Sequence, residues 1–521
     1  MIAILQFDAA SRMHLERMLA AGHLPGLASL RSRGTWLELN TPAVHFEGAA
    51  SYSLSTGVNL GGHGLYYPWL WSATEQRVRF YDDVPAPEAV WERIGRAGRR
   101  SLVIDPYEIR APERIHGLFL SGWQFKNRVV LRTRSVPRSI QRAFERELGR
   151  PPVGEEIYGR PDAASLLRLR NSLVAAPRRG SDVIETILKR EPFDLVWISL
   201  SAAHIGGHRF YNIAQLSEEL QLSRQHEKGN VVETPGLASA LHEIYRAVDE
   251  ALARIVAAFP EETDIIIMSP TGMGPNNSRS HLLPAMLDAV LTDRNPSAFQ
   301  RKVAPGSSLW QIRAAVPTPV RSWIAQMIPD WLAVELAARL ELRGVQWDRT
   351  KAFMLPNDDA GYLRLNLRGR ERDGIVDPNE ADYLLEKITK GLLTFQNGDG
   401  SQTVHKIWRI SELGYPGPCR DQLPDLVVQW NERVITPLMG VRSKQFGEIP
   451  SPGWGTGRTG CHSGEAWALV IPGPSRLRTP IMSPHIIDIT STICTVLEVD
   501  PAGLQGRSLL EPRGYEAKET A

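Results

Sequence analysis

Two histidines four residues apart follow an apolar stretch in the first half of the chain. His204 and His208 lie in Ser201–Tyr211, directly behind the run 195–200. Residues at positions i and i+4 share one face of a helix, so a helical turn here would present two imidazoles together, a spacing used to hold a metal ion. The alternative is a pair of ordinary polar residues. The position favours a site, because ligands of open α/β sheets bind at the carboxyl ends of strands.

A third histidine stands in a glycine-rich loop far along the chain. His462 lies within Gly460–Gly464, just before the apolar run Ala466–Ile471. A single histidine in such a loop is often only a surface residue. Together with His204 and His208, however, it would complete a site of three nitrogens with an open position, as catalytic zinc requires.

An acidic residue follows the first apolar run. Ile2–Phe7 is short and largely apolar, which is typical of a strand buried on both faces of a parallel sheet, and Asp8 comes directly after it. Because ligands of open α/β sheets bind at the carboxyl ends of strands, Asp8 is also a candidate site residue, here with a carboxylate in place of an imidazole.

The elements that must position these residues alternate between strand and helix. A helical stretch, 238–257, precedes one strand-like run, and a last helix is expected at 487–497. This rhythm predicts an α/β fold with a mainly parallel sheet flanked by helices. The strands are expected at 2–7, 101–104, 195–200, 264–268, 362–367, 426–429 and 466–471.

One region lacks this rhythm. Residues 285–350 have a helical pattern with interspersed tryptophans, which predicts a helical insertion or cap. We therefore expect residues 1–284 to form the first part of the core and residues 351–511 the second part. The polar residues 512–521 are expected to be a disordered tail.

A series of short motifs runs in order from one end of the chain to the other, leaving mainly the predicted insertion unmatched. The motifs are Phe7-Asp8, Gly22–Gly34, Ser55–Gly64, Asp105–Pro112, Gly117–Gly122, Tyr245–Ala251, Asn366–Glu371, Pro424–Val428, Asp488–Ile493 and Gly506–Leu509. Together they resemble the type I phosphodiesterase and nucleotide pyrophosphatase branch of the alkaline phosphatase superfamily. The resemblance implies an alkaline phosphatase-like fold. In that family, two metal ions clamp a phosphoryl group beside a Thr or Ser nucleophile.

At some family positions this chain keeps the expected residue, and at others it does not. Asp8 matches the first metal ligand of the family, and His462 matches its last histidine. The nucleophile should lie about nine residues before the pair Thr56-Gly57, and that position holds Glu47. Covalent phosphoryl transfer through a hydroxyl is therefore not expected.

The other departures fall on metal ligands. The family motif Asp-x-x-x-His has become His204 and His208, and Ser269–Gly272 (Ser-Pro-Thr-Gly) replaces Ser-Asp-His-Gly. Three imidazoles thus remain at one metal position. Only Asp8 remains at the other, and one carboxylate cannot hold a divalent ion tightly against water. We expect one divalent metal, zinc in the first place, with iron or manganese if Glu47 or Asp8 adds an oxygen ligand.

Three further candidates lie near these motifs. His45 precedes Glu47 by two residues, Thr271 belongs to the altered Ser-Pro-Thr-Gly motif, and His281 follows that motif. His45 and His281 could each point into the cavity of the expected metal site, or each could be a hydrogen-bonded structural residue. His63, which also matches a family position, is expected to be structural.

Charge and cysteine usage narrow the class of protein. The 60 Lys and Arg against 58 Asp and Glu give a formal net charge of +2, so no nucleic acid partner is expected. The three scattered cysteines are too few for a disulfide framework, which favours a reducing compartment. Without a signal peptide pattern or a run of 18 apolar residues, the sequence predicts a cytoplasmic protein with no membrane span.

These observations favour an enzyme over other classes. We expect a metal-dependent hydrolase that acts on a small molecule, a phosphate-type ester, with an activated water as the nucleophile and Glu47 as its general base. A non-hydrolytic biosynthetic metalloenzyme is one alternative. The other is a pseudoenzyme, which would keep the fold as a binding protein. Neither the substrate nor the oligomeric state follows from the sequence.

Overall fold

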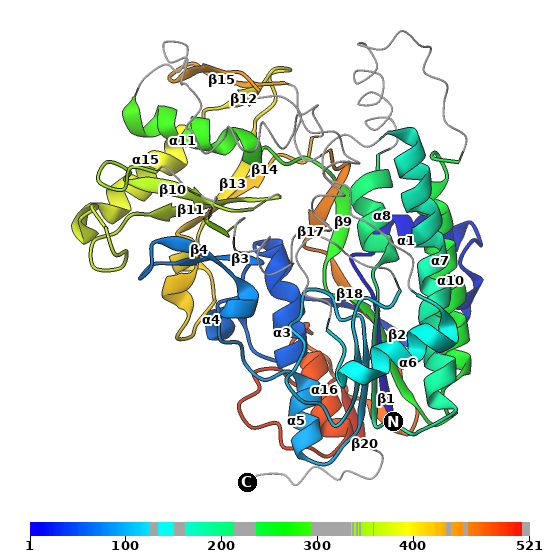
Figure 1. Ribbon diagram of the computed structural model, residues 1–521. Helices are drawn as coiled ribbons and strands as arrows, with labels where there is room; N and C mark the ends of the chain where they lie inside the picture. The colour runs from blue at the N-terminus through cyan, green and yellow to red at the C-terminus, as the bar shows by residue number, and fades with distance from the viewer. Residues whose placement is uncertain are drawn as a thin grey trace.

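The chain folds into two main β-sheets with helices packed on them (Figure 1). The computed structural model describes residues 1–124, 134–150, 162–212, 236–293, 335, 338–339, 342, 345–357, 359–433, 439–451 and 457–512. Most of the predicted insertion, 285–350, lies outside these residues, and so does nearly all of the predicted tail, 512–521.

The larger sheet has seven strands in the order β2-β18-β8-β1-β7-β5-β6. Five neighbouring strands, from β8 to β6, run parallel, while β18 is antiparallel to both β8 and β2. Every residue of β1, β7, β8 and β18 is buried, as expected for apolar strands covered on both faces. The bounds are β1 Ile2–Phe7, β2 Thr35–Leu39, β5 Ser101–Ile104, β6 Gly117–Leu120, β7 Leu195–Leu200, β8 Asp264–Ser269 and β18 Ala466–Ile471.

Helices cover both faces of this sheet (Figure 1). One face packs against α1 Arg12–Ala20, α2 Pro25–Arg31, α6 Arg138–Leu148, α7 Ala163–Leu188, α8 Ala202–Phe210 and α10 Ala240–Ala257. The other face packs against α3 Ala50–Thr56, α5 Val90–Arg96 and α16 Asp488–Val496. The result is the three-layer arrangement of helices, sheet and helices that a central parallel sheet requires.

The second sheet is antiparallel and has its own core. Its strand order is β10-β11-β14-β13 (Ala352–Leu355, Gly361–Leu365, Leu426–Trp430 and Val404–Arg409). Helices α11 Leu283–Thr292 and α15 Ala381–Leu392 pack on one face. The other face packs against aromatic residues of the segment that holds α4 Leu60–His63 and the hairpin of β3 Trp69–Ser72 and β4 Arg77–Phe80.

Short ribbons complete the described structure. The pair β17 Gly460–Ser463 and β9 Gly272–Pro275 lies between the two sheets in Figure 1. A small sheet has the order β12-β15-β16 (Gln396–Asn397, Val441–Ser443 and Gly447–Ile449), and β19 Ser475–Leu477 pairs with β20 Leu510–Pro512.

The structure confirms the expected α/β class and most of the predicted elements. The strands at 2–7, 101–104, 195–200 and 466–471 have the predicted bounds, and the helices at 238–257 and 487–497 differ by one or two residues at their ends. The strands predicted at 362–367 and 426–429 exist as β11 and β14, but they pair antiparallel in the second sheet. None of the described helices combines the length and the apolar composition that crossing a bilayer requires.

Candidate metal centre

Helix α8 carries two of the three histidines. It starts directly after β7, and all nine of its residues are buried. Its glycines allow close packing, since a Cβ at Gly206 would meet Ile244 at 2.7 Å and one at Gly207 would meet Met273 at 2.7 Å. One helical turn separates the two imidazoles, and Nε2 of His204 lies 3.1 Å from Nε2 of His208.

The third histidine comes from the other end of the chain. His462 lies on β17, where it pairs with Met273 of β9. Its Nε2 is 2.9 Å from Nε2 of His204. The ligand atoms of His204, His208 and His462 all lie within 4.8 Å of one another, and no other such group of three metal-type side chains occurs in the described part of the chain. The fold therefore gathers three side chains that lie up to 258 residues apart in sequence.

These distances suit a transition metal with nitrogen ligands. At a tetrahedral zinc ion with zinc to nitrogen bonds of about 2.0–2.1 Å, neighbouring nitrogens are separated by about 3.3 Å. The observed separations of 2.9 and 3.1 Å are close to this value. Burial, helped by the positive charge of Arg458, holds the pKa of His208 well below its usual value. A neutral imidazole is the form that binds a metal.

Each imidazole also has an oxygen beside its other nitrogen. Nδ1 of His204 is 2.8 Å from Asp8 Oδ2, and Nδ1 of His208 is 2.9 Å from the carbonyl oxygen of Gly460. Nδ1 of His462 is 3.1 Å from Asp359 Oδ2, which also accepts from the backbone N–H of His462 at 3.3 Å. The three rings are thus held from outside while their Nε2 atoms face inward.

Asp8 lies outside the group of three. Its Oδ1 accepts a hydrogen bond from Gln6 Nε2 at 3.0 Å, and its Oδ2 contacts His204. Burial acts to raise the pKa of Asp8, but the charge and the hydrogen bond of His204 outweigh burial, so this pKa lies below its usual value. An ionised carboxylate on Nδ1 of a histidine is a common outer partner in metal sites.

Glu47 lies near enough to His462 to interact with its charge, and two side chains hold its carboxylate. Asn357 Nδ2 donates to its Oε1 at 2.7 Å, and Tyr362 Oη donates to its Oε2 at 3.0 Å. Burial raises the pKa of Glu47 to about 7, and the negative charge of Asp359 adds to this shift, whereas the charge of His462 opposes it. Glu47 can therefore exchange a proton near neutral pH.

Asn357, Asp359 and Tyr362 are site residues that sequence reasoning missed. Asn357 and Asp359 belong to the polar turn between β10 and β11, and Tyr362 lies on β11. The sequence Asn-Asp-Asp-Ala-Gly at 357–361 is a signal that could have drawn attention to this turn, since it is a polar cluster between two apolar strands. Tyr107 was also missed, and the centre of its ring lies 4.3 Å from the centre of the His204 ring.

The lower-ranked candidates have other surroundings. His45 contacts Tyr415 Oη through Nδ1 at 2.9 Å, and its ring packs edge-on against Trp408. Thr271 donates from Oγ1 to the carbonyl oxygen of Ser463 at 2.9 Å, which ties its loop to the strand of His462. His281 lies on the short 3₁₀ turn Ser280–Leu282. None of the three belongs to the group of ligand atoms.

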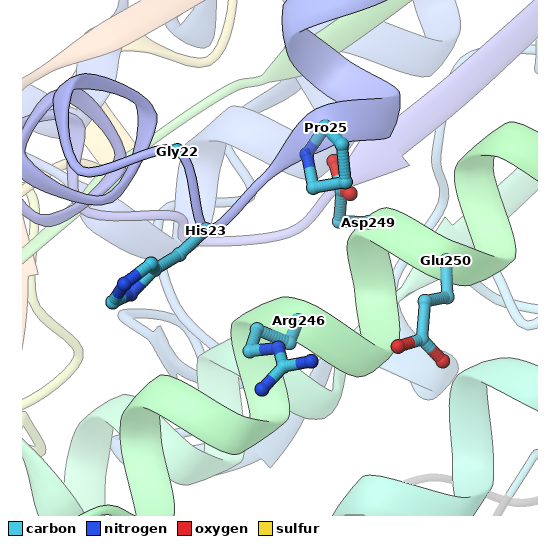
Figure 2. A pocket seen from close by; sticks show the side chains of 6 residues that line it. All are labelled: Gly22, His23, Pro25, Arg246, Asp249 and Glu250. Atoms are coloured by element: carbon cyan, nitrogen blue, oxygen red, sulfur yellow. The ribbon is translucent and has the colours of Figure 1, made fainter.

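A separate pocket lies between α10 and the segment that connects α1 to α2. It has a volume of about 280 Å³ and is lined by Gly22, His23, Pro25, Arg246, Asp249 and Glu250 (Figure 2). No residue of the candidate metal centre lines it. Asp249 uses its carboxylate to accept from the backbone N–H groups of Gly26 and Leu27 at the start of α2, so its role there is structural.

Comparison with known protein families identifies the chain at the level of the family. The sequence pattern of the type I phosphodiesterase / nucleotide pyrophosphatase family matches residues 2–436. The chain belongs to this family. A comparison with curated protein sequences gives no significant match.

Comparison with solved structures gives similar chains at low sequence identity. Phosphonoacetate hydrolase from Sinorhizobium meliloti 1021, in complex with phosphonoacetate, has a TM-score of 0.50 at 14% identity over 95% of each chain. Murine ectonucleotide pyrophosphatase / phosphodiesterase 5, inactive and in complex with AMP, has a TM-score of 0.48 at 11% identity, covering 98% of this chain and 99% of that one. At 14% identity, the likeness to phosphonoacetate hydrolase shows a similar fold and nothing more.

Proposed function

We propose that this family member is a metal-dependent hydrolase of phosphate-type esters with a single divalent ion held by His204, His208 and His462. The observation that carries the proposal is the convergence of three Nε2 atoms, with separations of 2.9 and 3.1 Å between neighbours. Three neutral imidazoles favour zinc, and iron or manganese would fit if Glu47 added an oxygen. When bound, the ion would supply a Lewis acid for the ester and lower the pKa of water.

Glu47 acts as the general base in this proposal. Its pKa of about 7 lies near the optimum for taking a proton from an attacking water at neutral pH. The hydrogen bonds from Asn357 and Tyr362 fix both of its oxygens, so the carboxylate does not have to reorganise during the reaction.

Water, rather than a side chain, is the nucleophile. Two serines near the family's nucleophile position have other partners: Ser53 Oγ lies 2.9 Å from Nε2 of His63, and Ser55 Oγ donates to the carbonyl oxygen of Tyr52 at 3.4 Å. In this proposal the carboxylate of Glu47 stands where the family has the hydroxyl that accepts the phosphoryl group, and it acts as a base instead of forming a bond to phosphorus. Hydrolysis without a covalent intermediate accounts for both features.

The substrate class is a small ester with a phosphate-type group. The family and the named ligands of related proteins, AMP and phosphonoacetate, support this class. The three cysteines, Cys419, Cys461 and Cys494, are free thiols, which supports a reducing compartment such as the cytoplasm.

Metal content of the purified protein tests the proposal. Elemental analysis is made on the wild type, on His204→Ala and on the control His405→Ala, which changes an exposed histidine of β13. Hydrolysis of an aryl phosphodiester is measured beside it. The proposal expects about one ion per chain and measurable hydrolysis, both lost in His204→Ala and kept in His405→Ala.

The other outcomes separate the alternatives. No metal in the wild type would overturn the proposal in favour of a binding protein. One metal without hydrolysis of any phosphate-type ester would overturn the hydrolase assignment and favour a non-hydrolytic metalloenzyme.

A further inference from the structure

The contacts of the three Nδ1 atoms, a hydrogen bond or hydrogen-bond distance for His208 and His204 and an ion-pair distance for His462, favour a proton on each Nδ1. The carbonyl oxygen of Gly460 can only accept, so Nδ1 of His208 must carry the proton of that 2.9 Å contact. The other nitrogen of a neutral imidazole is then a lone pair. Nε2 of His208 therefore faces the centre of the group without a proton.

Asp8 favours a proton on the same nitrogen of His204. One oxygen of this carboxylate contacts Nδ1 of His204, and the other is occupied by Gln6 Nε2 at 3.0 Å. Gln6 is itself fixed, because its Oε1 accepts from Ser199 Oγ at 2.8 Å. This carboxylate can accept from Nδ1–H of His204, and a neutral imidazole with its proton on Nδ1 has a lone pair on Nε2, which points inward.

Asp359 acts on the third imidazole. Its Oδ2 lies 3.1 Å from Nδ1 of His462 and 3.3 Å from the backbone nitrogen of the same residue. Both backbone polar groups of Asp359 have partners. Its N–H donates to Asn357 Oδ1 at 2.7 Å, and its carbonyl oxygen accepts from Trp430 Nε1 at 2.8 Å. The carboxylate is thus held in place by the second sheet.

When all three imidazoles are neutral and carry their proton on Nδ1, Nε2 of His204 faces Nε2 of His462 at 2.9 Å and Nε2 of His208 at 3.1 Å with no proton to share, and the lone pairs repel. A cation at their centre converts this repulsion into coordination. We propose that Asp8 and Asp359 are positioning residues that fix the Nδ1–H tautomers of His204 and His462 and thereby set the affinity of the centre for its ion. This inference rests on the proposed function, because it specifies how the same centre is prepared for a metal.

The turn that carries Asp359 gives this arrangement a second consequence. Asn357 of the same turn donates to Glu47, so one short segment orients both a proposed ligand and the proposed base. The second sheet therefore does more than cover the first, since its β10–β11 turn sets the relative position of His462 and Glu47.

Zinc affinity of the full-length protein tests the role of the two carboxylates. Wild type, Asp8→Asn, Asp359→Asn and the control Asp249→Asn are titrated with zinc against a competing chelator. The control removes a buried carboxylate that accepts backbone hydrogen bonds at 2.6 and 2.9 Å but does not contact the histidines. We expect affinity to fall 10- to 100-fold in Asp8→Asn and Asp359→Asn, the loss usual for outer partners of metal ligands, and to stay within threefold in Asp249→Asn.

A second readout does not depend on bound metal. Nitrogen-15 chemical shifts of the histidine rings in the metal-free protein report which nitrogen carries the proton. We expect Nδ1–H for His204 and His462 in the wild type, and a gain of the Nε2–H form for His204 in Asp8→Asn and for His462 in Asp359→Asn.

The results distinguish failure of this inference from failure of the proposed function. Wild-type zinc binding with unchanged affinity in folded Asp8→Asn and Asp359→Asn would overturn the inference alone, as would Nε2–H tautomers in the wild type. Absence of zinc binding in the wild type would overturn the proposed function, and the tautomers would then still decide whether the carboxylates position the rings.

Discussion

The carbonyl oxygen of Gly460 lies 2.9 Å from Nδ1 of His208, so the strand that carries one proposed ligand also orients another. The approach of the two backbones is close, since a Cβ at Gly460 would lie 2.3 Å from the carbonyl oxygen of Gly207. The backbone N–H of Thr459 also donates to the carbonyl oxygen of His208 at 2.7 Å. Strand β17 and helix α8 therefore form one unit, although more than 200 residues separate them.

Gly460→Ala should move strand β17 away from helix α8. The new methyl group cannot fit at 2.3 Å from a backbone oxygen, so β17 must move away from α8 and carry His462 with it. We expect loss of the bound metal and of hydrolysis, with the protein still folded. Metal content and thermal unfolding check this, with Gly274→Ala on the paired strand β9 as control, since a Cβ at Gly274 meets nothing within 4 Å. Retention of metal in Gly460→Ala would show that the contact does not set the ligand geometry.

Glu47→Gln should separate chemistry from metal binding. The amide keeps the size of the side chain, its oxygen can still accept from Asn357 Nδ2 and its NH2 group can donate to Tyr362 Oη, but it cannot take a proton from water. We expect kcat to fall by a factor of about 10² to 10⁴, the usual contribution of a general base, with metal content unchanged. Steady-state kinetics on an aryl phosphodiester checks the rate. A variant that hydrolyses the ester at the wild-type rate would remove Glu47 from the mechanism.

A buried ion pair in the second sheet should be important for stability. Glu371 accepts from Arg364 Nε and Arg370 Nε, both at 2.8 Å, and from Trp71 Nε1 at 2.7 Å, while its side chain is 0% exposed. Glu371→Ala leaves the buried Arg364 without this partner, which typically costs about 3–5 kcal/mol.

Urea unfolding followed by circular dichroism measures that cost. The matched control is Glu386→Ala, which removes the surface pairs of this residue with Lys390 and Arg409 and should change the free energy of unfolding by no more than about 1 kcal/mol. Equal changes in the free energy of unfolding would mean that the hydrogen bonds and ion pairs of Glu371 stabilise the protein no more than a surface ion pair does.

Much of the fold and part of the candidate site could be predicted from the sequence. Apolar runs such as Leu195–Leu200 are buried on both faces, and such runs have a clear pattern. His204 and His208 could be paired because helical periodicity fixes their separation. His462 could be added because its glycine-rich loop, like α8, borders a central strand.

Other parts of the site could not be predicted, for physical reasons. Asp359 contacts His462 across 103 residues of sequence, and no local pattern encodes such a contact. The direction of a side chain is also not encoded: Asp8 was expected as a weak ligand, and the fold points its carboxylate at the outer nitrogen of His204 instead. The antiparallel pairing of β11 and β14 depends on tertiary packing, which periodicity does not report.

His63 should give the protein a measurable pH dependence of stability. The imidazole is 3% exposed, its Nδ1 accepts from the backbone N–H of Leu65 at 3.0 Å, and its Nε2 lies 2.9 Å from Ser53 Oγ. Burial lowers its pKa from 6.5 to about 3. Since the folded pKa is below the unfolded one, the contribution to stability is fully present above pH 6.5 and is lost as pH falls toward 3.

His63→Gln should remove this dependence, because an amide can make both hydrogen bonds without titrating. Between pH 7.5 and pH 5.0 the free energy of unfolding of the wild type should fall by about 2 kcal/mol more than that of His63→Gln. Urea unfolding of both proteins at the two pH values measures the difference, in which the titration of all other groups cancels. Parallel losses in the two proteins would show that His63 takes up a proton as readily in the folded chain as in the unfolded one, and that its burial beside Ser53 does not keep it neutral.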